Sequence, residues 1–405
     1  MSSLPLPATS TDSPPPRTSG AAARIHVLQV LGNAIVGGME CWVERLIERL
    51  PAERFAITAL LPYEGPFAQR LRRFGIEVFV TPMPEDPSWA SIQMATALVH
   101  SSGIDLLHAH LPNAHMLAAL AGRLAGRPVM TTIHGRQLAL VDLELHRSAG
   151  SHLSVVCQQT YFHALGLGVN AALLSHDPNG VDCAVFAPRE RPRGEASLRA
   201  RLGLPEDTPM LGFIGRLSPE KGPELFVRSM LPLLARLPQA HAVMAGDGPM
   251  GPAIRRQIAQ LRLGRKIHLL GLQQDMPKLY SELDLVVSSS HSEAMPLNLM
   301  EAMASGLPVV ATRVGGVPDI VEHGHGGWLV APNDCEDLGA RCAELLGDGE
   351  MRARFGESAR SRAVERLDLD RSIERISELF TQLARSTVIE KAGGKLHGVS
   401  ARAAR

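Results

Sequence analysis

The sequence runs Leu283-Asp-Leu-Val-Val-Ser-Ser-Ser290 and continues shortly afterwards as Glu293-Ala-Met-Pro-Leu-Asn-Leu-Met-Glu301. The first run is short, apolar and rich in valine, which is typical of a buried strand in a parallel sheet. Pro296 suits the first turn of a helix, where a missing backbone N–H costs nothing. The stretch therefore predicts a strand, a loop that carries Glu293, and a helix that carries Glu301 about one and a half turns from its start.

The start of this predicted helix lies between two carboxylates. The free backbone N–H groups of a helix N-terminus form a natural phosphate site. Glu293 and Glu301 flank that site, and ionised carboxylates accept hydrogen bonds from hydroxyl groups. A ligand with phosphate in the middle and hydroxyls at both ends would fit between them, and a nucleotide sugar is such a ligand.

Length and composition limit the class of protein. The 405 residues favour two domains, and 45% hydrophobic with 20% charged residues is a soluble, globular composition. The 41 basic and 41 acidic residues cancel, which argues against nucleic-acid binding through bulk charge. The five scattered cysteines form no CxxC pair, and no apolar run approaches the roughly 18 residues that span a bilayer. The sequence, which also lacks a signal-peptide core, predicts a reduced, cytoplasmic setting.

Short apolar runs alternate with amphipathic stretches, which predicts α/β domains with doubly wound parallel sheets. The first set of predicted strands is Ile25–Leu31, Phe55–Leu60, Glu77–Thr81, Asp105–His108, Pro128–Ile133 and Leu153–Val156, with helices such as Met39–Leu50 and Asn113–Leu124 between them. The second set is Met210–Ile214, His241–Ala245, Ile267–Leu270, Leu283–Val287, Pro308–Ala311 and Trp328–Val330. Ligands of such folds bind at the carboxyl ends of the strands, so two facing domains predict an interdomain cleft.

Two basic residues follow the first strand of the second set. The run Gly215-Arg-Leu-Ser-Pro-Glu-Lys221-Gly contains a Ser-Pro pair that is typical of a helix start. Arg216 and Lys221 then project from one strand-end loop, of the same kind as the loop that carries Glu293. Either cation alone would be typical of a solvated surface, but two fixed cations can stabilise the charge of a departing diphosphate. The spacing of a P-loop is absent.

Two glycine-rich loops also follow predicted strands. Gly246-Asp-Gly248-Pro-Met-Gly251 matches GxGxxG, but no acidic residue ends the next predicted strand, so we discount a dinucleotide fingerprint. This loop either brings backbone close to a ligand or forms only a tight turn. The adjacent Gly37 and Gly38 also allow two interpretations. Either they let the backbone approach a phosphate or sugar closely, or they only make the first loop flexible.

Histidines gather near strand ends in the first half of the chain. His108 is expected to point into the sheet as a core histidine, whereas His110 and His134 follow strands and are candidates for a role in the cleft. A metal site would need a third ligand at a typical spacing and an acidic partner, which this pattern lacks.

Taken together, these motifs resemble the retaining glycosyltransferases of family 4, which have the GT-B fold. The resemblance covers roughly residues 25 to 385 and rests mainly on Glu293-x7-Glu301, Gly215-Arg216-Leu-x3-Lys221-Gly222 and Asn179-Gly-Val-Asp182. It implies two Rossmann-like doubly wound domains that face an interdomain cleft. The donor nucleotide sugar would be a substrate, and neither a cofactor nor a metal is expected.

The resemblance and the composition together predict the domain organisation. An acceptor domain over residues 24–188 and a nucleotide-sugar domain over 189–366 precede a helix over 367–385 that crosses back to the first domain. Residues 1–23, rich in Ser and Pro, and the basic tail 386–405 are expected to be disordered. Contact with an anionic membrane is the alternative for the tail.

The resemblance also assigns roles to individual residues. Arg216 and Lys221 would clamp the diphosphate, Glu293 would grip hydroxyls of the donor sugar, and Glu301 would accept hydrogen bonds from the ribose. His134 would line the reaction centre. Further donor contacts are expected from Gly37, Gly38, Gly215, Gly246, Gly248, Met295, Pro296 and Leu297, and Asp182 is expected to be a structural turn residue.

The predicted function is transfer of a sugar with retained configuration, from a UDP- or GDP-sugar to a hydroxyl of a glycan or lipid-linked acceptor, in cell-surface polysaccharide or glycolipid assembly. Front-face attack is favoured over a covalent intermediate on Glu293. The alternatives are a nucleotide-sugar epimerase of the same fold and a non-catalytic glycan or nucleotide binder. A peripheral position at the inner membrane is compatible with this function, and Trp42 and Arg45 would then face either a lipid acceptor or solvent.

One position departs from the family pattern. Ala294 stands where the family commonly has glycine, directly after the first glutamate. If that position requires a positive φ, alanine would cost roughly 1 kcal/mol and shift the loop.

Overall fold

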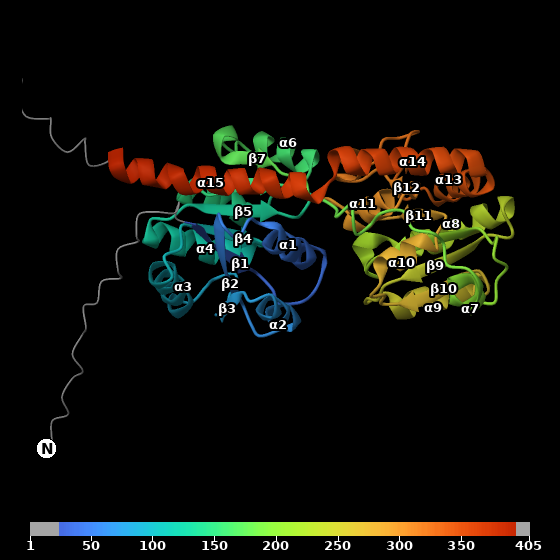
Figure 1. Cartoon of the computed structure of the whole chain (residues 1–405), viewed down its shortest axis with the longest axis horizontal. Coiled ribbons are helices and arrows are strands. Elements are labelled where there is room, and N and C mark those ends of the chain that lie inside the picture. The colour runs from blue at the N-terminus through green and yellow to red at the C-terminus, as the bar shows by residue number, and fades with distance from the viewer. Residues whose placement is uncertain (1–23, 394–405) are drawn as a thin grey trace, which may run out of the picture.

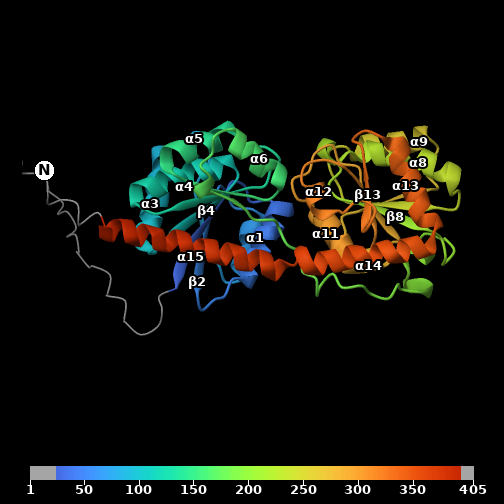
Figure 2. The same ribbon diagram turned by 90° about the horizontal axis from the view of Figure 1, so that it is seen from above.

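The computed structural model describes residues 24–393, with side chains described through residue 386. Two α/β domains lie side by side, and the last two helices run one after the other along both of them (Figures 1 and 2). The predictions for residues 1–23 and for the end of the basic tail lie outside the described residues. The final helix α15 (Leu369–Gly393) continues past Ser386, so the sequence placed the start of the tail too early.

The N-terminal sheet has seven parallel strands in the order β3-β2-β1-β4-β5-β6-β7. Its strands are β1 (Ile25–Leu31), β2 (Phe55–Leu61), β3 (Glu77–Val80), β4 (Leu106–His110), β5 (Val129–Ile133), β6 (His152–Val155) and β7 (Leu174–His176). The first six agree with the predicted runs to within two residues at each end. The sequence missed β7 because this short edge strand, Leu-Ser-His, contains no apolar run.

The helices of this domain cover both faces of its sheet. They are α1 (Gly38–Arg49), α2 (Pro66–Arg73), α3 (Trp89–Ser101), α4 (Pro112–Ala125), α5 (Leu140–Ala149) and α6 (Gln158–Gly166), with a 3₁₀ turn, η1 (Ala171–Leu173), before β7. Buried side chains of α1 and α2 form one apolar cluster with the sheet, and those of α3 and α4 form another. Burial on both faces explains why the strands read as nearly continuous apolar runs.

The C-terminal sheet has six parallel strands in the order β10-β9-β8-β11-β12-β13. They are β8 (Met210–Ile214), β9 (His241–Ala245), β10 (Ile267–Gly271), β11 (Leu285–Ser288), β12 (Val309–Thr312) and β13 (Gly327–Val330). The helical segments are η2 (Gly194–Ala196), α7 (Leu198–Arg201), η3 (Pro219–Lys221), α8 (Pro223–Arg236), α9 (Gly251–Gln260), α10 (Met276–Ser281), α11 (Leu297–Ala304), α12 (Val317–Ile320), α13 (Cys335–Gly347) and α14 (Gly349–Arg366). In both sheets the order reverses beside the first strand of the domain, and that is where such folds hold ligands.

The last helix joins the two halves of the molecule. Leu369, Ile373, Ile376 and Phe380 of α15 belong to the apolar cluster of the N-terminal domain. Just before it, Val181 and Asp368 form an isolated parallel bridge. Within the described residues, no helix is both long and apolar enough to span a membrane.

Candidate functional site

The loop after β8 is tied to the loop after β11, and this fixes Lys221 in space. Gly222 has a φ of 57°, and a Cβ there would lie 2.2 Å from the carbonyl oxygen of Ser289. The Ser289 hydroxyl donates to the Gly222 carbonyl at 2.7 Å, and the His291 N–H donates to the Glu220 carbonyl at 2.9 Å. Glycine is therefore required at 222 for the two loops to approach this closely.

Lys221 and Glu293 meet in this arrangement. The Lys221 Nζ lies 2.6 Å from Glu293 Oε1, and the Ser290 hydroxyl donates to the same oxygen at 2.8 Å. Glu293 is buried. Both hydrogen bonds that described side chains make with Glu293 go to its Oε1, so its Oε2 is available to a ligand. The structure thus brings together two residues that lie far apart in the sequence.

Arg216 is exposed in the same loop as Lys221. It forms no hydrogen bond or ion pair with another side chain in the described part of the chain. The run after it does start a helical turn, as the Ser-Pro pair predicted, but only the single 3₁₀ turn η3; α8 begins at Pro223. An exposed, unpaired guanidinium at the carboxyl end of a parallel sheet is available to an anion.

The helix α11 points its N-terminus into the same region. Pro296 is the N-cap of this helix rather than its first residue, and Leu297 begins it. The Asn298 side chain donates to the Ile214 carbonyl at 2.6 Å, which ties the first turn of α11 to the end of β8. Ala294 does not have a positive φ. The alanine at this position is therefore unstrained, and the doubt that it raised about the loop is removed.

The glycines at the other strand ends fall into two groups. Gly246 has a φ of 139°, and a Cβ there would lie 1.9 Å from the Gly215 carbonyl oxygen. A Cβ on Gly248 would lie 2.4 Å from the carbonyl oxygen of Leu217. These two glycines are needed for packing between the loops, which favours the tight-turn reading. A Cβ on Gly38, at the start of α1, would instead meet nothing within 4 Å.

Glu301 is held by residues from both domains. Arg45 of α1 donates to Glu301 Oε1 at 2.9 Å, and the Tyr280 hydroxyl donates to Oε2 at 3.0 Å. Burial raises the pKa of Glu301, and the Arg45 charge with its hydrogen bond opposes that shift. Both expectations for the α1 pair were wrong: Trp42 is 1% exposed, and Arg45 contacts the opposite domain rather than solvent or a lipid.

Three histidines, of which His108 and His110 are buried and His134 is half-buried, gather towards the carboxyl ends of β4 and β5. His108 bonds to the Thr132 hydroxyl at 2.8 Å, as expected of a core histidine. The His110 Nδ1 lies 3.0 Å from the His134 Nε2, and its Nε2 lies 3.0 Å from Gln29 Oε1. Desolvation lowers the pKa of His134 to about 4 and the pKa of His108 to about 3. His110 is fully buried and contacts His134, so it does not line an open surface, contrary to the role in the cleft that the sequence suggested.

The turn expected at Asp182 has a structural counterpart. The Asp182 side chain accepts hydrogen bonds from the backbone N–H groups of Ala184 and Val185 at 3.0 Å each, as a turn residue does. Within the described residues no group of three or more His, Cys, Asp or Glu side chains is arranged to hold a metal ion. Sequence reasoning did not identify Tyr280, Ser290 and the role of Arg45, because no local pattern shows which distant carboxylate a side chain will reach.

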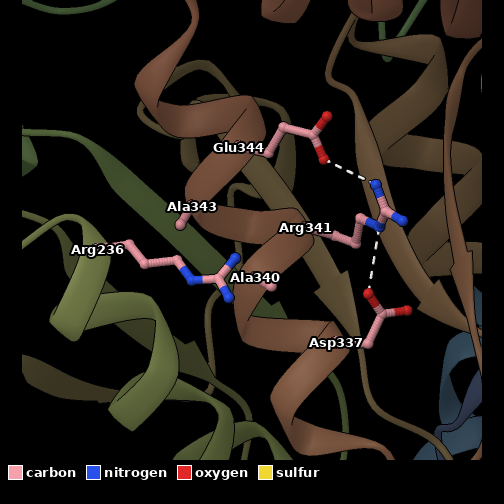
Figure 3. Close-up of a pocket in the computed structure, with 6 residues that line it drawn as sticks. All are labelled: Arg236, Asp337, Ala340, Arg341, Ala343 and Glu344. Atoms are coloured by element: carbon pink, nitrogen blue, oxygen red, sulfur yellow. Dashed lines mark hydrogen bonds and ion pairs between the residues drawn. The ribbon is translucent and has the colours of Figure 1, made fainter.

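A separate hollow lies between α8 and α13 (Figure 3). Arg236, which lines it, ends α8, whereas the strand-end loops lie at the beginning of that helix. Arg341 in this hollow pairs with Asp337 at 3.2 Å and with Glu344 at 3.0 Å. Its charge is already balanced and it lies on the helix surface, so we do not assign the site there.

Comparison with solved structures defines the class of fold. HepE of Anabaena (Alr3699), solved with UDP and with UDP-glucose, matches with a TM-score of 0.77 in both complexes. It is 25% and 24% identical, over 89% of this chain and 100% of that one. Two Rossmann-like domains, each built on a parallel sheet, constitute the GT-B fold.

Sequence comparison then places the chain in a family. Residues 195–362 match the model of the glycosyl transferases group 1, and residues 36–185 match that of Glycosyltransferase Family 4. The D-inositol 3-phosphate glycosyltransferases of Corynebacterium efficiens and Corynebacterium glutamicum are each 32% identical over 282 residues, which is 63% of this chain and 66% and 67% of theirs. An Escherichia coli UDP-Gal:alpha-D-GlcNAc-diphosphoundecaprenol alpha-1,3-galactosyltransferase is 24% identical over 89% of this chain and 98% of that protein. The chain belongs to the group 1 glycosyltransferases.

Proposed function

We propose that this protein transfers a hexose from a nucleotide diphosphate sugar, with UDP as the favoured nucleotide, to an acceptor hydroxyl with retention of configuration. One observation carries the proposal: the Lys221–Glu293 ion pair joins the loop after β8, which also carries Arg216, to the loop after β11 that leads into α11, at the switch point of the C-terminal sheet. HepE, which was solved with UDP-glucose, supports UDP as the nucleotide.

The charges at the site support a mechanism. As the C1–O bond breaks, negative charge builds on the leaving diphosphate, and Arg216 and Lys221 with the helix N–H groups stabilise it. Glu293 already holds Lys221 through Oε1, so its Oε2 can accept a hydrogen bond from a sugar hydroxyl. In front-face attack, the leaving phosphate oxygen takes the proton of the acceptor hydroxyl. The cations and the helix supply the charge stabilisation that a metal would otherwise provide.

The acceptor side differs in character. Side chains exposed by 46% or more follow strands β1, β2, β3 and β5 at their carboxyl ends: Ile35, Val36, Tyr63, Trp89 and Leu140. Exposed apolar side chains around one edge are typical of binding surfaces. They support an acceptor with an apolar part, such as a lipid-linked sugar, and assembly of a glycolipid or surface polysaccharide at the inner membrane.

The first experiment is a panel of UDP-, GDP- and ADP-sugars measured by thermal shift, because a ligand that binds the folded state raises its apparent stability. We expect UDP-sugars to give the largest shift. Transfer is then measured with free and lipid-linked acceptors, and the anomeric configuration of the product is determined. Inversion of configuration would contradict the proposed mechanism.

Two controls separate the competing functions. Incubation of the donor alone should yield no epimer, whereas an epimerase would convert it without any acceptor. EDTA should leave the transfer rate unchanged. A rate that falls with EDTA and recovers with Mg²⁺ or Mn²⁺ would overturn the metal-independent scheme.

A further inference from the structure

The helix α1 sends two arginines out of the N-terminal domain, one turn apart. Arg45 reaches Glu301 of α11, with its Nη2 2.9 Å from Glu301 Oε1. Arg49 pairs instead with Asp182 and with Asp370, which lie between the domains and at the start of α15. Only the first of these arginines therefore contacts the carboxylate to which the ribose of the donor is assigned.

Glu301 retains free capacity as an acceptor in this network. Each of its oxygens receives one hydrogen bond from a described side chain, from Arg45 and from Tyr280. An ionised carboxylate has about four lone-pair sites. Two neighbouring ribose hydroxyls can therefore donate to Glu301 while Arg45 stays in place.

Arg45 has an unused donor at the same place. Its Nη1 is buried and has no hydrogen-bond partner among the described residues. The guanidinium lies 5.7 Å from the centre of the Phe186 ring, which covers one side of it. A buried charged donor without a partner is costly, and a ribose hydroxyl can accept a hydrogen bond through its oxygen while it donates through its hydrogen.

We propose that Arg45 is a donor-binding residue supplied by the N-terminal domain, and that its free N–H donates to a ribose hydroxyl that in turn donates to Glu301. The inference rests on the proposed function, because it requires a nucleotide at this site. It gives the ribose a contact with each domain. Preference for ribose over deoxyribose then depends on both Glu301 and Arg45.

The opposite reading is that Arg45 occupies the ribose site and must leave before the donor binds. The two readings predict changes of opposite sign. If Arg45 binds the ribose, removal of its guanidinium weakens nucleotide binding. If Arg45 blocks the ribose, the same change strengthens binding.

The experiment is isothermal titration of the full chain with UDP, 2′-deoxy-UDP and 3′-deoxy-UDP. The proteins are wild type, Arg45→Ala, Arg45→Lys and, as the matched control, Arg49→Ala. We expect Arg45→Ala to weaken UDP binding about tenfold, the scale of one hydrogen bond to a charged group. Arg49→Ala should stay within about twofold of wild type, because Arg49 joins the domains without contact to Glu301.

The deoxy nucleotides test the ribose contact itself. Wild type should bind at least one of them about tenfold more weakly than UDP, and Arg45→Ala should lose most of that preference. Arg45→Lys keeps a positive charge beside Glu301 but not the planar guanidinium fork that reaches two acceptors at once. It should fold normally and bind UDP and the deoxy nucleotides with similar affinity. Thermal unfolding of each variant confirms that it is folded.

The failures are distinguishable. A wild-type chain that binds neither UDP nor GDP nor ADP would refute the proposed function. A wild-type chain that binds UDP, while Arg45→Ala binds it equally or more tightly or keeps the full ribose preference, would refute only the role of Arg45.

Discussion

The carboxyl edges of the two sheets differ in their electrostatics although their folds are alike. The C-terminal edge carries the exposed Arg216 and the ion pair between Lys221 and Glu293, in which one oxygen of Glu293 is left for a ligand. The N-terminal edge carries histidines whose pKa values are lowered by desolvation, to about 3 at His108 and to about 4 at His134, so both are neutral near pH 7. Under the proposed function, the first edge would hold the charged leaving group and the second the neutral hydroxyl of the acceptor.

The largest effect should come from the carboxyl edge of the C-terminal sheet, with Arg216, Lys221 and Glu293, which we call the charged edge. Lys221→Ala removes the cation closest to Glu293, and we expect kcat to fall about 100-fold or more because charge on the leaving diphosphate is no longer stabilised. Steady-state kinetics with donor and acceptor measure it. The control is Lys266→Ala, because Lys266 lies directly before β10, at the opposite edge of the sheet, where it donates to the Pro238 carbonyl. If Lys221→Ala kept the wild-type kcat, Lys221 would not stabilise the leaving group and the proposed role of the charged edge would be contradicted.

A second change tests whether the loops of the charged edge depend on close packing. Gly246→Ala places a Cβ 1.9 Å from the Gly215 carbonyl oxygen at a φ of 139°, so we expect a loss of about 1–3 kcal/mol in the free energy of unfolding. Urea unfolding measures this loss. Gly264→Ala is the matched control, because a Cβ there meets nothing within 4 Å. If the two variants were equally stable, Gly246 would be free for a ligand contact rather than needed for packing.

Changes at the carboxyl edge of the N-terminal sheet, with His108, His110 and His134, which we call the neutral edge, should lower kcat less. His134→Asn removes an uncharged side chain that bonds to His110, and we expect kcat to fall about tenfold, the scale of one hydrogen bond. Because the pKa of His134 is lowered to about 4, its protonation should not alter the wild-type rate between pH 6 and 8. The control is His100→Asn, at an exposed position on α3. A wild-type pH profile with an inflection near 6.5 that disappears in His134→Asn would show that His134 titrates normally and would contradict this assignment.

The last prediction concerns the dependence of stability on pH. The folded-state pKa of His108 is about 3, below the ordinary 6.5, so the unfolded chain binds a proton that the folded chain does not. Stability is therefore full above about pH 6.5 and falls as the pH drops towards 3, by up to about 1.4 kcal/mol per pH unit. In His108→Gln this contribution should vanish, and urea unfolding at pH 7, 6 and 5 would detect it. If the free energy of unfolding of His108→Gln depended on pH as in wild type, another group would be responsible for the loss of stability at low pH.

The strands of both sheets and the position of the Glu293–Glu301 segment were predictable from local sequence patterns. The alternation of apolar runs located twelve of the strands, because most of them are buried on both faces and a strand of that kind consists almost entirely of apolar residues. The bounds of β1, β8 and β9 agree with the predicted runs at both ends. The motif around Glu293 and Glu301 placed both carboxylates near one helix N-terminus, because a strand, a loop and a helix are successive in the chain.

The sequence by itself thus determined the two parallel sheets, their strand-end loops and the residue types displayed there, all of which depend on neighbours within one turn or one strand. Tertiary structure alone decided that Lys221 meets Glu293, that Arg45 reaches Glu301 and that Trp42 is buried. These contacts join segments separated by an entire sheet or domain. Their geometry depends on strand order and on how the domains pack, and no local periodicity records either.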